Sequence, residues 1–279
     1  LLALSCGVMN KYGFNLSSDV KGGTLTEIKY TETKPLQSEI EAKIVALNLG
    51  GFSVRPSGET NYVIRTRELT QTESQTLQKD LGGILERQNT IGPVAGSELR
   101  SKAMKAIAVV VLMIVIFITF AFRKVSLPVQ SWKYGLATIV ALAHDVIIPT
   151  GIFVYLGHTL GFEIDLLFVT GLLAILGYSV HDTIVVFDRV RENLYLNQNK
   201  SSEDFETTVG KSVSQTFGRS INTSLTIFIT LLALYLFGSH ATQNFALLLT
   251  IGVVIGTYSS IFVASPLLVT FYKWGRKKV

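Results

Sequence analysis

The stretch Leu166–Asn193, LLFVTGLLAILGYSVHDTIVVFDRVREN, indicates a membrane protein. It begins as an apolar run of membrane-spanning length and ends as a charged helix. Between Leu166 and Phe187 its only ionisable side chains are His181 and Asp182. At ~1.5 Å of rise per residue, Asp182 lies roughly 24 Å along a helix that enters at Leu166, inside a ~30 Å hydrocarbon core. A carboxylate there needs a partner or a water path, because its burial in hydrocarbon is costly.

The alternative is that this helix ends early and leaves Asp182 in water. Residues 183–187, TIVVF, continue the apolar run beyond Asp182 and argue against that interpretation. We therefore expect Asp182 to lie within the membrane.

The composition of the whole chain is that of a polytopic membrane protein. Hydrophobic residues make up 48% of the 279 and are concentrated in long runs, with a mean hydropathy of +0.41. The formal net charge of +5 comes from Lys and Arg beside these runs, where they orient the chain in membrane lipid, so no nucleic-acid partner is expected. Cys6 is the single cysteine, which excludes an intrachain disulfide.

The first residues form an apolar run, LLALSCGVM, that is too short to span a bilayer. No charged segment precedes it and no small-residue cleavage site follows it, so a signal peptide is the less favoured interpretation. We expect residues 1–11 to be the remnant of transmembrane helix 1, either cut or belonging to a longer polypeptide.

Residues 12–102 are polar and have the pattern of a small α+β domain. Thr70 and Glu73 form a capping box at the start of a helix that is expected to extend through Ile84 and Leu85. The expected strands are 24–30, 52–55, 62–67 and 90–94, and the first expected helix follows Pro35. This β-α-β-β-α-β order predicts a ferredoxin-like unit. Because that fold serves many functions, it indicates no activity.

Five apolar runs follow, in a transmembrane region of residues 103–279. They cover about residues 103–122, 134–156, 164–187, 217–237 and 245–272, and with the first remnant they make six spans. Lys and Arg gather in the connections at 123–133 and 188–216 and in the tail, whereas the connections 157–161 and 238–243 have none. The positive-inside rule then predicts cytoplasmic termini and an external, periplasmic or extracellular, 12–102 domain.

Two other spans contain ionisable residues that can meet Asp182. Asp145 lies mid-run, roughly 16 Å from the cytoplasmic start of its helix, and Arg219 lies near the cytoplasmic start of the next-but-one helix. Asp182 and Arg219 are expected at comparable depths, so a direct or water-bridged pair is feasible. The arginine favours a charged carboxylate, whereas desolvation favours the neutral acid. A carboxylate held between these opposing effects is suited to binding and releasing a proton.

Each of these residues also has a structural interpretation. Arg219 can snorkel from the helix end to the interface, and Asp145 can hold helices together by a buried hydrogen bond. His144 and His181 each precede an aspartate, but neighbouring helical residues point ~100° apart, so the two members of a pair are not expected to face one site. The histidines are expected to be packing or lining residues, with no metal site and no cofactor.

Two further motifs are expected to serve packing or the cytoplasmic surface. The charged group where the central helix leaves the membrane should form i,i+3 and i,i+4 pairs, and glycines in the spans should allow close helix contact. The charged residues are Asp188, Arg189, Arg191 and Glu192, and the glycines are Gly171, Gly177, Gly252 and Gly256.

Four motifs occur in order along the chain. They are SSDVKGGT at 17–24, IGPVAGSELR at 91–100, GYSVHDTIVVFDRVREN at 177–193 and RSINTS at 219–224. Together they resemble the SecF family, the SecF subunit or SecF half of the bacterial SecDF protein-export complex, in the resistance-nodulation-division superfamily. With the six-span layout, the resemblance covers essentially the whole chain.

The resemblance implies a proton-motive-force-dependent accessory of the Sec translocon that promotes late protein translocation across the cytoplasmic (inner) membrane. The implied partners are SecD, the SecYEG translocon, YajC, YidC and the translocating unfolded polypeptide. By residue, Asp182 matches the family's essential intramembrane carboxylate, Arg219 its functional arginine and Asp145 its acidic position in the preceding span. The resemblance thus implies that all three residues take part in proton transport. Asn222 lies within the matching RSINTS motif.

Other classes of function remain as alternatives. The sequence has no Gly-x-x-x-x-Gly-Lys-Ser/Thr motif, so the energy must come from the membrane gradient or a partner, and we expect no enzyme activity. An intramembrane aspartyl protease would need Asp145 and Asp182 to share a proton, yet their expected depths differ and no Gly-x-Gly-Asp signature is present. A passive membrane scaffold or assembly subunit is the other alternative.

Overall fold

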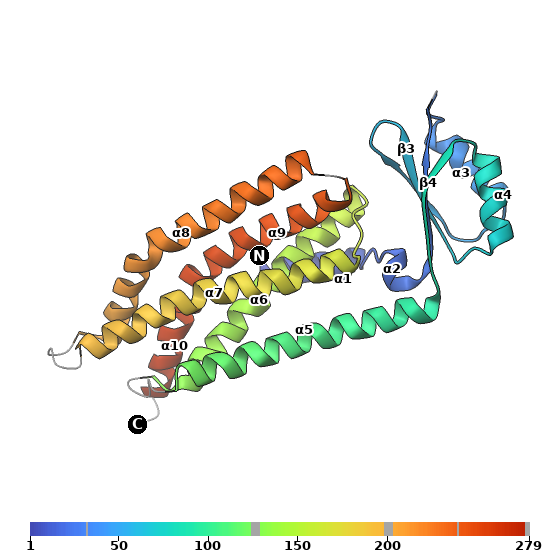
Figure 1. Ribbon diagram of the computed structural model, residues 1–279. Helices are drawn as coiled ribbons and strands as arrows, with labels where there is room; N and C mark the ends of the chain where they lie inside the picture. Colours follow the sequence, from blue (N-terminus) through green and yellow to red (C-terminus); the bar gives the residue numbers. More distant parts are fainter. Residues whose placement is uncertain (32, 124–128, 198–202, 239, 277–279) are drawn as a thin grey trace. The chain divides into compact units, whose positions relative to one another are not determined.

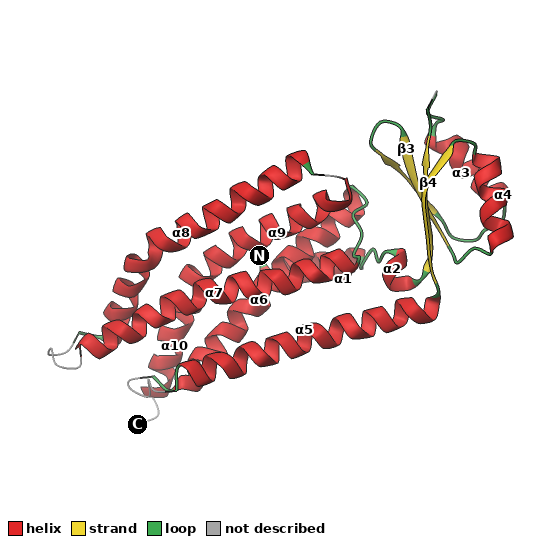
Figure 2. Cartoon of the chain, viewed as in Figure 1, coloured by secondary structure: helices red, strands yellow, loops and turns green. Residues whose placement is uncertain are grey.

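The computed structural model describes residues 1–31, 33–123, 129–197, 203–238 and 240–276 (Figure 1). The chain divides into two units. One contains Leu1–Gly13, Ala106–Tyr155 and Phe168–Val279, and the other contains Phe14–Lys105 and Leu156–Leu167. The first unit is helical, and the second contains the sheet (Figure 2).

The helical unit is built from long apolar helices. These are α5 (Pro93–Ala121), α6 (Ser131–Thr159), α7 (Leu166–Asn197), α8 (Phe205–Phe237) and a last helix made of α9 (His240–Ser259), the π-helical turn η1 (Ser260–Ala264) and α10 (Ser265–Arg276). Each is long and apolar enough to cross a membrane, which confirms the five predicted spans. The first helix, α1 (Leu2–Tyr12), has 11 residues, and its membership of a sixth span stays a prediction.

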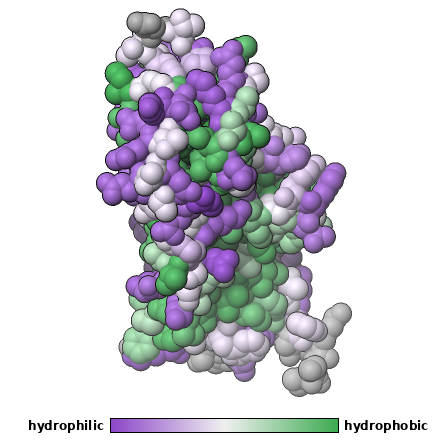
Figure 3. Space-filling model, turned by 90° about the vertical axis from the view of Figure 1, so that its right-hand side faces the viewer, coloured by the Kyte–Doolittle hydropathy of each residue, from purple (hydrophilic) through white to green (hydrophobic). Residues whose placement is uncertain are grey.

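An aromatic cluster ties the helices of this unit together. The rings of Phe122 and Tyr134 stack with centroids 5.1 Å apart, and Phe187 of α7 meets Tyr134 edge-on. The surrounding core also draws apolar side chains from α8 and α10. Other large apolar side chains, such as Leu112 and Ile116 of α5, point outward, as expected for a membrane span. Apolar surface accordingly gathers over the helical unit in Figure 3.

The second unit is a four-stranded antiparallel sheet with two helices on one face (Figure 2). Its elements are α2 (Ser18–Lys21), β1 (Gly23–Lys29), α3 (Gln37–Ala46), β2 (Ser53–Ser57), β3 (Asn61–Thr66), α4 (Gln71–Leu81) and β4 (Ile84–Ile91), with strand order β2-β3-β1-β4. The predicted hairpin is confirmed as the β2–β3 pair. Ile28 and Ile64 of the sheet pack against Ile44 of α3 and Leu77 of α4, which closes a separate apolar core.

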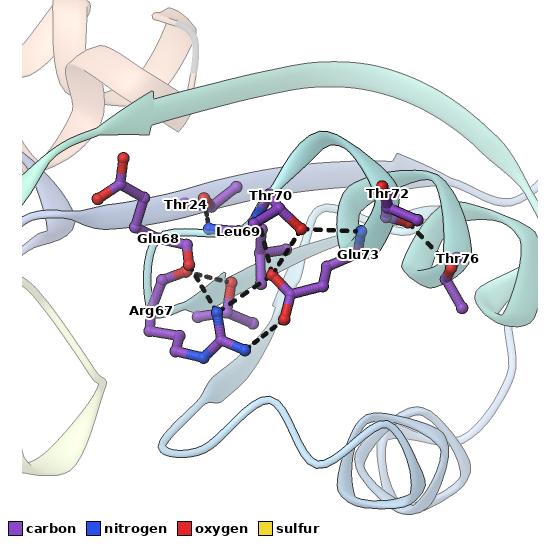
Figure 4. Close-up of polar contacts among 9 residues, drawn as sticks. Thr24, Arg67, Glu68, Leu69, Thr70, Thr72, Glu73 and Thr76 are labelled. Atoms are coloured by element: carbon purple, nitrogen blue, oxygen red, sulfur yellow. Dashed lines mark hydrogen bonds and ion pairs between the residues drawn. The ribbon is translucent and has the colours of Figure 1, made fainter.

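The start of α4 is fixed by the predicted capping box, which is confirmed (Figure 4). Glu73 Oε2 accepts from the Thr70 backbone N–H at 2.9 Å, and Thr70 Oγ1 accepts from the Glu73 N–H at 3.4 Å. Arg67 also pairs with Glu73, and this hydrogen bond, followed by those from Thr70, lowers the pKa of Glu73 to about 2. The Leu69 N–H donates to Thr24 Oγ1 at 3.0 Å, which joins this turn to β1.

Two boundaries in this unit differ from the sequence prediction. The helix expected to run through Ile84 and Leu85 ends at Leu81, because Gly82 and Gly83 adopt φ angles of 63° and 100°. Ile84 and Leu85 instead begin β4, so the strand predicted at 90–94 is wrong beyond Ile91. Pro93 starts α5, where its missing N–H costs no intrahelical hydrogen bond.

The connection between α6 and α7 belongs to the sheet-containing unit. The Ile164 N–H donates to the Asn15 carbonyl at 2.8 Å, and the Ser17 N–H donates to the Ile164 carbonyl at 3.0 Å. Arg65 of β3 donates through Nη1 to Glu163 Oε1. These contacts join the connection 156–167 to β3 and to the segment that precedes α2.

Candidate functional site

Asp145 of α6 is a fully buried carboxylate with partners on other helices, at 0% exposure. Its Oδ2 accepts hydrogen bonds from the hydroxyls of Ser179 on α7 and Ser259 on α9, the latter at 2.6 Å. Its Oδ1 lies 2.9 Å from His144 Nδ1. Both oxygens are therefore occupied, and the carboxylate joins three helices.

The contact between His144 and Asp145 contradicts the sequence interpretation of this pair. Their Cα–Cβ bonds diverge, but both side chains are buried and the imidazole turns back onto the neighbouring carboxylate. The His144 ring also stacks on Tyr258, with centroids 6.2 Å apart. The histidine is thus a packing residue, as predicted, and a partner of Asp145, which was not predicted.

Asp182 of α7 is almost as buried, at 7% exposure, but is partnered differently. Its Oδ2 is a buried atom with no hydrogen-bond partner within the described part of the chain. The hydroxyls of Ser220 on α8 and Ser260 in η1 are neighbours of this carboxyl group. Ser220 Oγ is likewise buried without a partner among the described residues. A carboxyl group with an unoccupied oxygen beside hydroxyl groups can take up and release a proton.

A small cavity with a mostly apolar lining lies beside Asp182, between α7, α8 and α9. Hydroxyl groups and Asp182 contribute to its wall, and Ser224 and Thr257 within that wall hydrogen-bond to each other at 2.5 Å. The cavity volume of about 30 Å³ is enough for about two water molecules. Ser179 lines the same cavity, so the residue that donates to Asp145 also borders the surroundings of Asp182.

Arg219 does not form the direct ion pair with Asp182 that the sequence left open. Its side chain is exposed on α8, and no Asp182–Arg219 ion pair exists among the residues described. The neighbouring residue Ser220 is buried and faces α7 instead. Any effect of Arg219 on Asp182 in this arrangement is a longer-range interaction of charges, and its role stays a prediction.

Small residues bring α7 and α9 close together, as predicted for three of the four glycines. A Cβ atom on Gly252 would lie 2.2 Å from Ile175, and one on Gly256 would lie 3.2 Å from the Cβ of Ser179. Gly171 packs similarly against Leu248. The prediction is wrong for Gly177, which lies on an exposed face of α7 with no described neighbour within 4 Å of a Cβ.

The charged group at the end of α7 forms the predicted i,i+3 pairs. Arg191 pairs with Asp188 at 2.5 Å, and Arg189 pairs with Glu192 at 2.6 Å. Arg189 Nε also donates to Gln215 of α8 at 2.7 Å. The role of these residues, and of the exposed Asn222 on α8, stays a prediction.

One connection beside this charged group was not predicted. Asn193 is buried and donates through Nδ2 to Ser212 Oγ at 2.8 Å and to Gln215 at 2.9 Å, which ties the end of α7 to α8.

Sequence reasoning also missed the serines around the two carboxylates, which are Ser179, Ser220, Ser259 and Ser260. Their signal was weak, because a serine within an apolar run is common and only the three-residue spacing of Ser179 and Asp182 suggested a shared face.

The fold and the site define a polytopic helical membrane protein with two buried carboxylates among its spans. Residues 72–274 match the family described as "Protein export membrane protein SecD/SecF, C-terminal". The chain is 42% identical over 280 residues to the protein translocase subunit SecF of Thermobaculum terrenum, covering 93% of this chain and 85% of that protein. It is 37% identical to SecF of Anaerolinea thermophila, covering 94% and 86%. The chain belongs to the SecF family.

Solved structures agree with this assignment. The crystal structure of SecDF from Thermus thermophilus, described as a translocon-associated membrane protein, matches with a TM-score of 0.84 at 31% identity. The match covers 98% of this chain and 36% of that chain. A second SecDF structure, in a super-membrane-facing form, matches with a TM-score of 0.68 at 30% identity, covering 99% and 37%.

Proposed function

We propose that the chain is a proton-motive-force-dependent accessory subunit of the Sec translocon that works with SecD in late protein translocation. Its relatives are named protein translocase subunit SecF, which supports the general role in translocation. The observation that carries the proton-coupled part is the Oδ2 atom of Asp182, which is buried without a hydrogen-bond partner in the described bundle and has a small cavity beside it. Ionisable groups at such positions are expected to serve ion or proton movement.

In this proposal Asp182 binds the proton, Arg219 supplies a positive charge at longer range, and Asp145 holds the surrounding helices in place. Moving one charge through ~100 mV releases about 2.3 kcal/mol. That free energy shifts a two-state equilibrium by roughly 50-fold, since 1.4 kcal/mol corresponds to a factor of ten. One proton per cycle therefore biases the equilibrium between two arrangements of the helices by that factor, whereas a shift from 1:99 to 99:1 needs about 10⁴-fold.

The finer assignments of location and architecture belong to the same proposal. We place the chain in the bacterial inner membrane with both termini cytoplasmic and the 12–102 domain periplasmic, on the strength of the Lys and Arg distribution. The strand order and antiparallel pairing support a ferredoxin-like topology for that domain. The α1 helix would then belong to the first of six spans.

The proposed partners follow from the family. SecD and the Sec translocon are implied by SecF and SecDF relatives. We extend the set to SecYEG, YajC, YidC and the unfolded polypeptide in transit. Neither a nucleic-acid partner nor a cofactor is part of the proposal.

Two alternatives make different demands on the carboxylates. A passive scaffold needs Asp145 and Asp182 only as structural groups, and the three partners of Asp145 fit that role for Asp145 alone. An intramembrane aspartyl protease needs the two carboxylates to share a proton. The hydrogen-bond partners of Asp145 are Ser179, Ser259 and His144, which argues against the protease.

The test is proton-gradient-dependent export from membrane vesicles that carry SecD and the Asp182→Asn variant. We expect export stimulation to fall to the level without this subunit, because Asn has nearly the same shape but does not titrate. Thr230→Ala is the matched control, since Thr230 is exposed on α8 and its hydroxyl donates to the Thr226 carbonyl of the same helix. Full activity of Asp182→Asn would remove Asp182 from the mechanism, and loss of SecD association would favour the scaffold.

A further inference from the structure

The connection between α6 and α7, residues 160–165, is attached through its backbone to the sheet-containing unit. Asn15 Nδ2 donates to the Phe162 carbonyl at 3.0 Å. Beyond that contact, Leu16 and Ile164 form a parallel β-bridge. Because the connection is short and its backbone is held in this way, the adjoining ends of α6 and α7 move together with the segment that precedes α2.

Two arginines of the sheet hold the same connection through their side chains. Arg65 of β3 donates to Glu163 Oε1, and Arg55 Nη1 of β2 lies 3.8 Å from that oxygen. The Glu163 side chain is only 8% exposed. Gly161 adopts a φ of 77°, and a Cβ atom there would collide with the Arg55 guanidinium group. Since separating a buried ion pair leaves an uncompensated charge, these contacts resist release of the connection from the sheet.

A second joint attaches this unit to the start of α5. A Cβ atom on Gly96 would lie 2.6 Å from the Gly22 nitrogen, and one on Gly22 would lie 2.7 Å from the Cα of Pro93. Glycines between two parts of a chain often permit reorientation, but here two backbones touch and leave no space for a methyl group. The motifs at 17–24 and 91–100, which contain these glycines, therefore build a close contact rather than a flexible tether.

The two helices that enter the connection carry both buried carboxylates. Asp145 belongs to α6 and Asp182 to α7, and Ser179 of α7 donates to Asp145. The two helices are therefore joined inside the bundle as well as through residues 160–165. Because a helix is a rigid element, a displacement of α7 at Asp182 also reaches the connection.

We propose that Arg65 and Glu163 are positioning residues that couple the sheet to the helix pair α6–α7. When Asp182 gains or loses a proton, the displacement of α7 is delivered to the sheet through the Arg65–Glu163 pair. The contact between Gly22 and Gly96 holds the sheet to α5, so the sheet turns when α6–α7 moves relative to α5. The inference rests on the proposed function, because it requires Asp182 to change its protonation state.

The first experiment measures proton-gradient-dependent export by the full chain with SecD, in a Cys6→Ser background. Glu163→Gln should reduce export about tenfold, the effect of one lost hydrogen bond between charged groups. Leu16→Cys with Ile164→Cys places thiols on bridged residues, where backbones lie ~4.8 Å apart and a disulfide fits. The oxidised disulfide should restore export to Glu163→Gln, and reduction should abolish the rescue. Glu39→Gln is the matched control, because Glu39 is exposed on α3, and it should leave export unchanged.

The second experiment measures whether the sheet-containing unit responds to Asp182. Spin labels on Asp80→Cys of α4 and Val109→Cys of α5, both at exposed positions, report the separation of the two helices. Asp182→Asn should change that separation when the Arg65–Glu163 pair is intact and should not change it when Glu163→Gln is also present. A merely structural role of Glu163 would leave the response to Asp182→Asn in place.

The outcomes separate this inference from the proposed function. Wild-type export in Glu163→Gln, or no rescue by the disulfide, would overturn the coupling. Loss of export when the disulfide forms beside an intact Glu163 would also overturn it, because the joint would then have to open. An inactive Asp182→Asn that leaves the label separation unchanged would overturn the coupling and leave the proposed function standing. If Asp182→Asn keeps full export, the proposed function fails and the coupling fails with it.

Discussion

Asp145 and Asp182 lie in the same bundle and are buried to nearly the same degree, yet their surroundings differ. Both oxygens of Asp145 have partners, drawn from Ser179, Ser259 and His144. Asp182 has a buried oxygen without a hydrogen-bond partner in the described chain, and a small cavity lies beside it. Burial therefore does not separate an anchor from a proton-binding group. In the proposed function the number of hydrogen bonds left unmade separates them, because each hydrogen bond that an ionised carboxylate accepts opposes its protonation.

A third carboxylate, Glu163, lies outside the spans. Its hydrogen bonding is intermediate between that of Asp145 and that of Asp182. Its Oε1 accepts from Arg65, and Arg55 Nη1 lies 3.8 Å from the same oxygen. Its Oε2 is buried without a partner in the residues that the structure describes. Burial raises the pKa of Glu163, and the charges of Arg65 and Arg55 oppose that shift. The three carboxylates thus differ in how completely their oxygens are hydrogen-bonded, and mutations can test the effect of that difference.

The largest effect is expected when the anchor is removed. Asp145→Ala leaves the buried hydroxyls of Ser179 and Ser259 without their acceptor and opens a cavity, at a cost of about 3 kcal/mol of unfolding free energy. Asp145→Asn keeps a carbonyl oxygen for both serines and an amide for His144, so it should fold normally and stay active in export. Denaturant unfolding of the purified protein in detergent measures the first effect.

The same two variants also test whether Asp145 itself titrates. If Asp145→Asn folds and assembles with SecD but loses export as completely as Asp182→Asn, then Asp145 titrates too. The distinction between an anchor and a proton-binding group would then be wrong.

A smaller, pH-dependent effect is expected at Glu163. Because the folded-state pKa lies above the ordinary value of 4.5, the folded form holds the proton more tightly than the unfolded form. Local stability should therefore be highest below pH 4.5 and decline as pH rises through the folded-state pKa. Hydrogen exchange of the Ile164 N–H, which bonds to the Asn15 carbonyl, reports on this segment. Glu163→Gln should remove the pH dependence, and an equal slope in both proteins would contradict the assignment.

The smallest effect is expected for Arg219→Lys. Since Arg219 is exposed and acts through its charge, Lys should preserve export to within about twofold, in line with the ~0.5 kcal/mol typical of exposed charge interactions. Arg219→Ala removes the charge and should change the carboxyl titration of Asp182. A large loss in the Lys variant would indicate bidentate contact with Asp182 in another state of the protein. Superimposable titrations of wild type and Arg219→Ala would make Arg219 an interface anchor.

Local signals in the sequence determined much of the architecture. Long apolar runs are sufficient to predict five spans, because the bilayer sets their length. The capping box at Thr70 and the β2–β3 hairpin also depend on residues a few positions apart. The prediction that α4 extends through Ile84 also came from a local signal, the spacing of apolar residues. It failed because Gly82 and Gly83 end the helix, which a hydrophobic pattern does not register.

In the candidate site, too, some features were predictable from local sequence and others were not. The sequence by itself placed Asp182 and Asp145 inside apolar runs, since hydropathy is a property of neighbouring residues. The tertiary structure was needed to show that Ser179 and Ser259 meet Asp145, and that Ser220 rather than Arg219 faces α7. These facts depend on which faces of helices far apart in the chain come together. The packing of these helix faces determines which side chains are close enough to hydrogen-bond. A pattern of apolar residues along the sequence carries no information about that packing.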